Sequence, residues 1–143
     1  MLWRHKNAAK GIAYGDAICA FESCHIVCRV LMEFLGLGVK YTATGPVLVQ
    51  KQKYFSVDGS TTDEVKVIDL GGTFAEISSV TPAERELLAT VYHMAHKSTA
   101  HLTIGARFMK DAGIVHNCIP VVDRLLRENL YDVVGKKPHE HTK

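Results

Sequence analysis

The longest periodic segment of the chain, from about Ala8 to Leu37, is the feature that most constrains its fold. Apolar residues recur there with helical spacing, and further apolar residues fall on its other sides. A helix that is apolar over most of its circumference is buried on more than one side. The segment therefore predicts either the central helix of a bundle or a helix that packs on a second subunit. Gly36 and Gly38 are expected to end it. Its narrow polar stripe consists of Glu22, His25, Arg29 and Glu33.

A second helix is predicted by the most distinct local signal in the sequence, Thr81-Pro82-Ala83-Glu84. The Thr81 side chain can cap the first free amides, and Pro82 has the backbone angle of a first helical position. Glu84 sits three residues after the cap and can reach back to it. The helix is expected to run to about Ser98. Its predicted core stripe is Leu88, Val91, Ala95 and Leu102.

The C-terminal third of the chain predicts two more helices. A short one starts near Ile104 and is closed by Asp111-Ala112-Gly113, and the last one starts between Cys118 and Pro120. The last helix is expected to end at Gly135, and residues 136–143 form a flexible polar tail. The core stripe predicted for the last helix is Val122, Leu125, Leu126, Leu130 and Val133.

Between the first two helices the chain is rich in β-branched and aromatic residues. We predict a β-hairpin inserted at about 39–72, with strands near 48–57 and 65–70 joined by a turn at 58–62. The lysines expected on its exposed face are Lys51, Lys53 and Lys66. Such lysines either discourage edge-to-edge aggregation or contact RNA. The predicted fold is a single, mostly α domain over residues 1–135, a bundle of about four helices with this hairpin. The alternative is an α+β domain with three strands in 39–77.

Composition narrows the class of protein. The chain has 143 residues, 47% of them hydrophobic, which suits one compact domain. Its net charge of +2 is smaller than the strongly positive charge typical of a dedicated duplex-DNA binder. No apolar run is long enough for a membrane span, and acidic residues interrupt the one stretch that loosely resembles a signal peptide. The four cysteines, expected to be reduced in a cytoplasmic protein, are Cys19, Cys24, Cys28 and Cys118.

Three of the eight histidines lie within the stretch Tyr92–Thr103, namely His93, His96 and His101. On a continuous helix, which advances about 100° per residue, His93 and His96 share a face, but His101 points elsewhere. The three cannot converge on a metal unless the helix breaks near Ser98. The HExxH and paired CxxC patterns of zinc sites are absent. We therefore predict no metal and no cofactor, and keep a His/Cys metal-binding bundle as an alternative.

The sequence His96-Lys97-Ser98-Thr99-Ala100-His101 resembles the RNxxAH signature of the HEPN superfamily (higher eukaryotes and prokaryotes nucleotide-binding). The resemblance covers about residues 10–37 and 81–134, and implies a small helical bundle that is often a dimer. Many HEPN proteins are metal-independent ribonucleases in toxin–antitoxin or defence systems, and others have lost catalysis. His101 and Ala100 match the motif directly. His96 stands where the motif has Arg, so the permanent cation that would hold phosphate is missing.

The resemblance implies specific roles for the residues around this motif. His101 would be the acid/base in cleavage next to a 2′-hydroxyl, with His96 as a second catalytic candidate. His96, Lys97 or Arg107 would hold the phosphate, and His93 is a further binding candidate. A homodimer could complete the site across its two-fold axis. Two non-enzymatic interpretations stay open. In the first, the histidines and Lys97 are solvated or hydrogen-bonded to a loop; in the second, the bundle is a dimeric module that binds a partner protein or a small apolar ligand.

Overall fold

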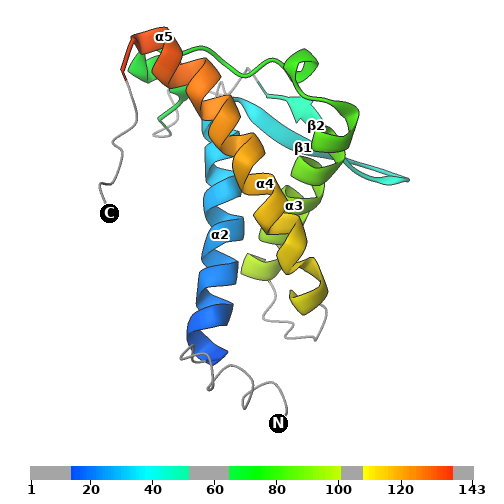
Figure 1. Ribbon diagram of the computed structural model, residues 1–143. Coiled ribbons are helices and arrows are strands. Elements are labelled where there is room, and N and C mark those ends of the chain that lie inside the picture. Colours follow the sequence, from blue (N-terminus) through cyan, green and yellow to red (C-terminus); the bar gives the residue numbers. More distant parts are fainter. Residues whose placement is uncertain (1–13, 52–64, 101–107, 137–143) are drawn as a thin grey trace, which may run out of the picture.

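The structure is a computed structural model that describes residues 14–51, 65–100 and 108–136. In this part of the chain three long helices pack against one another, and an antiparallel β-hairpin lies beside the second of them (Figure 1). This confirms a mostly helical bundle with an inserted hairpin. The long elements are α2 (Tyr14–Phe34), β1 (Leu37–Thr42), β2 (Gly45–Gln50), α3 (Pro82–Ala100) and α4 (Phe108–Leu126). The short elements are η1 (Val67–Leu70), η2 (Ile77–Ser79), a π-helical turn η3 (Arg127–Tyr131) and α5 (Asp132–Val134).

The core lies where the three long helices and the hairpin meet. Leu88, Val91 and Ala95 of α3 are fully buried, which confirms this part of the predicted stripe. The fourth member of that stripe, Leu102, lies outside the described residues. Further fully buried side chains of the core include Met32, Leu35, Leu37, Cys118 and Leu125. No helix of the described residues is long and apolar enough to cross a membrane.

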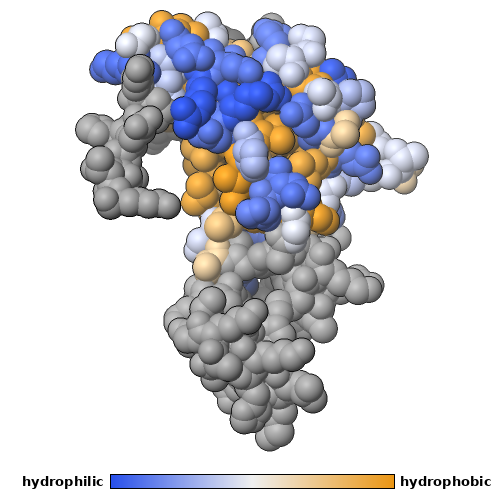
Figure 2. Space-filling view, in the orientation of Figure 1, coloured by the Kyte–Doolittle hydropathy of each residue, from blue (hydrophilic) through white to orange (hydrophobic). Residues whose placement is uncertain are grey.

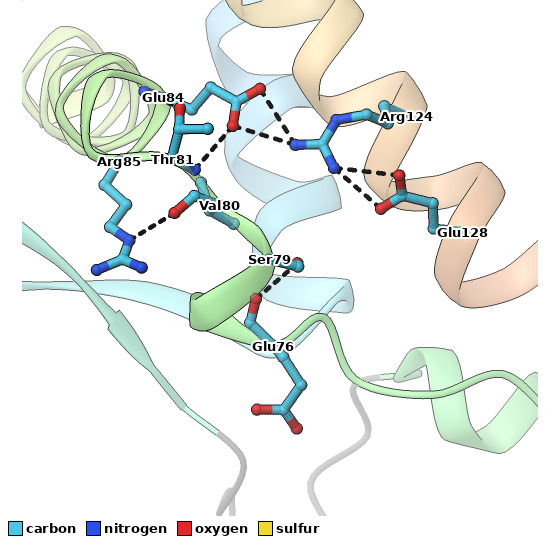
Figure 3. A network of polar contacts seen from close by, with 8 residues as sticks. All are labelled: Glu76, Ser79, Val80, Thr81, Glu84, Arg85, Arg124 and Glu128. Atoms are coloured by element: carbon cyan, nitrogen blue, oxygen red, sulfur yellow. Dashed lines mark hydrogen bonds and ion pairs between the residues drawn. The ribbon is translucent and has the colours of Figure 1, made fainter.

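The start of α3 forms the predicted capping box (Figure 3). The Thr81 amide donates to Glu84 Oε2 at 2.9 Å, and the Glu84 amide donates to Thr81 Oγ1 at 3.3 Å. Arg124 Nη2 on α4 also donates to both Glu84 oxygens, at 3.1 and 3.2 Å, while its Nη1 donates to Glu128. The Thr81 amide and Arg124 together lower the pKa of Glu84, against a smaller effect of burial. One carboxylate therefore both caps α3 and ties it to the end of α4.

The hairpin is present, but its predicted strands were wrong. Its strands are Leu37–Thr42 and Gly45–Gln50, with Val39 opposite Leu48. Gly45 has a φ of 129° at the turn, a conformation that favours glycine. The segment predicted as the second strand instead contains the 3-10 turn η1, because the Asp69 carboxylate accepts the Lys66 amide at 2.7 Å and Gly71 ends the turn in the left-handed region. Residues 52–64 lie outside the described part.

The predicted basic face of the hairpin was also wrong where the structure describes it. Lys66 is only 8% exposed and lies beside η1 rather than on a strand. Lys51 follows β2, and its ammonium lies 5.8 Å from the centre of the Tyr92 ring on α3. Lys53 is outside the described residues. The alternating pattern of the sequence did not predict that Lys51 packs on the Tyr92 ring or that Lys66 is buried.

The two predicted C-terminal helices are one helix from Phe108, which continues through η3 and α5 to Val134. Gly113 does not end this helix, because a glycine inside a helix lowers its stability by only about 1 kcal/mol relative to alanine. Pro120 is exposed, so the carbonyl that it leaves without a helical donor lies on the solvent side. The π turn adds one residue to its helical turn and shifts the helical phase of the residues after it. Val133 is consequently 46% exposed instead of buried, whereas Gly135 ends the helix as predicted.

Candidate functional site

The C-terminal half of α3 and strand β1 bring one tyrosine and two histidines together. Tyr41 Oη lies 3.3 Å from His93 Nδ1, and the two rings meet edge to face with centroids 5.4 Å apart. The His96 ring lies 6.4 Å from the Tyr41 ring. Tyr41 is 49% exposed, and His96 is exposed as well. We call these three residues the histidine–tyrosine surface.

A charged network lies directly beneath this surface and holds α3 on α2. The buried Tyr92 donates its hydroxyl to Glu33 Oε1 at 2.5 Å, and Arg29 Nε donates to the same oxygen at 3.0 Å. The Arg29 guanidinium also lies 5.3 Å from the centre of the Tyr92 ring. Burial works to raise the pKa of Glu33, but the hydrogen bonds from Tyr92 and Arg29 outweigh it and lower that pKa. Glu33 is therefore held as a carboxylate. Its hydrogen bond fixes the position of Tyr92, the residue that precedes His93.

Only two of the five predicted site residues can be placed with their side chains. His93 and His96 share a face of α3, as the helical spacing predicts, and Tyr41 joins them. Lys97 lies within α3, but its side chain is outside the described part of the structure. His101 and Arg107 also lie outside it. The acid/base role of His101 and the phosphate-holding roles of Lys97 and Arg107 therefore stay predictions.

Sequence reasoning missed two residues of this region. Tyr41 was interpreted only as part of a β-rich run, and no local pattern connects it with histidines fifty positions later. Glu33 was recognised as one of the polar stripe of the first helix, which was the available signal. The second missed residue is Tyr92, the partner of Glu33. A tyrosine in a helical pattern is equally typical of core and surface, so the pattern did not single it out.

A second region of interest is an apolar groove of about 370 Å³ between α2 and α4. Its walls carry Cys24, Val27, Cys28, Ile119, Val122 and Leu126. On the face that Figure 2 shows, hydrophobic residues gather below the polar upper end of the molecule, where α2 and α4 pack together. Cys24, Cys28 and Cys118 are free thiols. Cys28 and Cys118 are buried in the core.

The described residues contain no group of three or more histidine, cysteine or acidic side chains placed to hold a metal ion. His116 and Cys118, two nearby residues of types that bind metals, lie on different sides of α4. His116 is exposed, whereas Cys118 is buried. The part of the chain that the structure describes thus offers no support for a metal-binding bundle.

Comparison of the chain with protein-family models, with curated proteins and with solved structures found no match. The described residues hold the long helices α2, α3 and α4 in the order that the sequence predicts.

Proposed function

We propose that this protein is an HEPN-like helical bundle that binds single-stranded RNA at its histidine–tyrosine surface. The observation that carries this proposal is the exposed Tyr41 ring packed beside His93 and His96 at the C-terminal half of α3. Unstacked bases bind proteins by stacking on aromatic side chains, histidine included. Each stacked base contributes about 1–3 kcal/mol.

The surroundings of the surface fit a polyanionic ligand. On α3, Lys97 comes four residues after His93, a spacing that places both residues on one face of the helix. Imidazole N–H groups donate hydrogen bonds, so the two histidines can contact phosphate oxygens. The net charge of +2 supports local rather than general binding of nucleic acid.

Binding without efficient cleavage is the expected activity. Stabilising the charge that develops on phosphate during cleavage needs a fixed cation in the transition state. An arginine would supply it as a permanent cation with planar, bidentate geometry, and His96 offers neither. The free cysteines of the described residues support a reducing, cytoplasmic location. A defence-associated role is part of the same proposal.

Fluorescence anisotropy with a short labelled single-stranded RNA tests the binding surface. The Tyr41→Ala variant is expected to raise Kd by about 5- to 150-fold, the equivalent of one lost stacking contact. Tyr41→Phe keeps the ring and should bind like wild type. His116→Ala removes an exposed histidine from α4, away from the surface, and serves as the matched control. Equal Kd values for wild type and Tyr41→Ala would refute the assignment.

Incubation of the protein with RNA in the presence of EDTA tests the role of the motif. If slow cleavage occurs, it is expected to persist in EDTA and to disappear in His101→Ala. Cleavage that His101→Ala performs as fast as wild type would show that His101 is not the acid/base. Binding and cleavage are measured on the same RNA, so loss of one can be separated from loss of the other.

We also propose that the protein is a homodimer in which α2 packs on a second copy. Ile26, Val27 and Val30 form an apolar stripe on the outer side of α2, and Val27 and Val30 are 53% and 54% exposed. Their spacing of three to four residues is that of a helix–helix seam. Ile119 extends the apolar surface onto α4 and is 45% exposed. This stripe is the specific observation that favours an interaction module.

Light scattering at micromolar concentration is expected to give twice the chain mass of 15.8 kDa. Val30→Lys places a charge in the stripe and is expected to give the single-chain mass. Val47→Lys is the matched control, because Val47 is a similarly exposed valine on β2 of the hairpin. A wild-type mass of 15.8 kDa, or dissociation by both variants alike, would exclude this interface.

A further inference from the structure

We propose that Lys51 and Arg29 form a phosphate subsite beside the histidine–tyrosine surface, where they hold the backbone of a single-stranded RNA whose base stacks on Tyr41. The subsite rests on the proposed RNA binding and names the residues that hold the sugar–phosphate chain. It consists of two cations from different segments, one carboxylate near both of them, and a glycine that leaves room for one of the cations.

The two cations meet at the ring of Tyr92. The guanidinium of Arg29 on α2 lies 5.3 Å from the centre of this ring, and the ammonium of Lys51, directly after β2, lies 5.8 Å from it. Both distances are within the roughly 6 Å at which an aromatic ring attracts a cation. Tyr92 immediately precedes His93 and lies one helical turn before His96. Both cations are therefore placed next to the histidine–tyrosine surface.

A glycine on β1 gives the Lys51 side chain its path. Gly38 is buried, and a Cβ built there would collide with Cδ, Cε and Nζ of Lys51. The backbone of Gly38 is not in the left-handed region, so space rather than backbone angle calls for glycine at this position. The Lys51 side chain thus crosses β1 at the residue that has no side chain of its own. Gly38 is a positioning residue for the ammonium at the Tyr92 ring.

The three charges of this cluster do not cancel. Arg29 Nε donates to Glu33 Oε1 at 3.0 Å. Burial works to raise the pKa of Glu33, but hydrogen bonds from Tyr92 and Arg29 and the positive charges of Arg29 and Lys51 together lower it. Glu33 is thus one carboxylate within reach of two cations. Lys51, Arg29 and Glu33 together carry a net positive charge, which attracts an anion.

An RNA strand can reach both cations. The side chain of Arg29 is 31% exposed, and Lys51 is half-buried. Arg29 directly precedes Val30 on α2 and so lies about 100° from it around the helix. The apolar stripe that carries Val30 is proposed to contact a second copy. The phosphate subsite therefore uses a different side of α2 from the proposed dimer interface.

The ligand of matching chemistry is a phosphate of the RNA backbone. Arg29 donates to Glu33 through Nε, so its two terminal nitrogens still offer N–H donors in the planar arrangement that suits phosphate. The Lys51 ammonium adds a positive charge with three donors. A base stacked on Tyr41 is joined to phosphates on both sides, so the same strand can occupy the surface and the subsite.

Fluorescence anisotropy with the short labelled RNA, repeated over a series of potassium chloride concentrations, tests the subsite. For single strands the slope of log Kd against log salt concentration changes by about 0.7 for each phosphate that the protein neutralises. Lys51→Gln is expected to raise Kd by about 3- to 10-fold at about 50 mM salt and to lower the slope by about 0.7. Lys40→Gln is the matched control. Lys40 is an exposed lysine of the same hairpin, and it points to the opposite face of β1 from Tyr41. Its slope should equal that of wild type.

Gly38→Ala tests the position of the charge without removing it. It is expected to raise Kd about as much as Lys51→Gln does, because the ammonium is displaced from the Tyr92 ring. The double variant should bind no more weakly than Lys51→Gln alone, since no ammonium is left to displace. Additive losses in the double variant would show that Gly38 acts in another way. Thermal unfolding followed by circular dichroism sets a temperature at which every variant is folded.

Arg29→Lys tests the second cation. It keeps the charge but loses the planar pair of donors, so Kd is expected to rise at least about threefold while the salt slope stays at the wild-type value. Wild-type affinity in this variant would remove Arg29 from the subsite.

Tyr41→Ala separates failure of the subsite from failure of the RNA surface. It is expected to raise Kd without changing the salt slope, because stacking neutralises no phosphate. If Tyr41→Ala weakens binding but Lys51→Gln keeps the wild-type Kd and slope, the subsite alone is refuted. Equal losses of slope in Lys51→Gln and Lys40→Gln would also refute it, because they indicate a general effect of charge. If wild type binds no RNA, the surface and the subsite are both wrong.

Discussion

Replacing Gly36 with alanine is expected to lower the free energy of unfolding by about 2–4 kcal/mol. Gly36 joins α2 to β1 with a φ of 78°, in the left-handed region that disfavours a Cβ. A Cβ at this position would also lie 2.5 Å from Cδ1 of the Phe74 ring. That ring packs against the core, and the next amide, Ala75, donates to Leu35 O at 3.0 Å. The ring has to move, and the contacts between the hairpin region and α2 move with it.

Gly71→Ala separates the two parts of this effect. Gly71 has a similar φ of 84°, but a Cβ there would meet only Val134 Cγ1, at an ordinary 3.5 Å. The backbone cost alone is about 1–2 kcal/mol. Urea denaturation of both variants gives the comparison, with the midpoint and slope fitted for each protein. Equal losses of stability in Gly36→Ala and Gly71→Ala would show that the approach of Phe74 is unimportant.

Tyr92→Phe is expected to lower the free energy of unfolding by about 1.5–3 kcal/mol at neutral pH, as is typical of a lost hydrogen bond to a charged group. The variant keeps the buried ring and removes only the hydroxyl that donates to Glu33. Glu33 then keeps Arg29 as a donor, but its carboxylate stays partly buried with one bond fewer. Tyr41→Phe is the control, since Tyr41 is exposed and its hydroxyl lies beside the His93 ring rather than a carboxylate. Its expected effect is within about 0.5 kcal/mol.

The stabilising effect of Tyr92 is expected to depend on pH. A carboxyl whose pKa is lowered by folding, as that of Glu33 is, stabilises the fold above its unfolded pKa of about 4.3 and loses this effect as pH falls through the folded value. Burial and the bond to Glu33 raise the pKa of Tyr92. The stabilisation that its protonated hydroxyl provides is therefore lost only as the pH rises above about 10. The difference between wild type and Tyr92→Phe should therefore be largest near neutral pH and shrink below about pH 4. A difference that is constant down to about pH 3 would contradict the role of the Glu33 carboxylate.

The same network matters for the candidate RNA surface. Tyr92 precedes His93 on α3, and its bond to Glu33 sets the position of this half of α3 relative to α2. Lys51, which comes directly after β2, lies over the Tyr92 ring and places the hairpin beside the same turn. Tyr41 on β1 reaches His93 only because the hairpin lies along α3. The network therefore supports the geometry of the surface without being part of it.

Local chemistry in the sequence determined the start of α3 and its buried side. The Thr81–Glu84 box lies within one turn, so its hydrogen bonds depend on nothing distant. The stripe of Leu88, Val91 and Ala95 results from helical spacing alone, and it is buried. The left-handed end of α2 at Gly36 was predicted for the same reason. Only glycine adopts that backbone without strain.

Contacts between distant segments were decided only by the tertiary structure. Strand pairing needs a partner, so the β-rich stretch could not show that Val39 lies opposite Leu48 or that residues 67–70 form a 3-10 turn. The π turn that exposes Val133 and the burial of Lys66 likewise have no local signal. Tyr41 meets His93 from a distant position in the chain. This pair carries the functional proposal, because sites form where packing brings together side chains that helical spacing alone cannot pair.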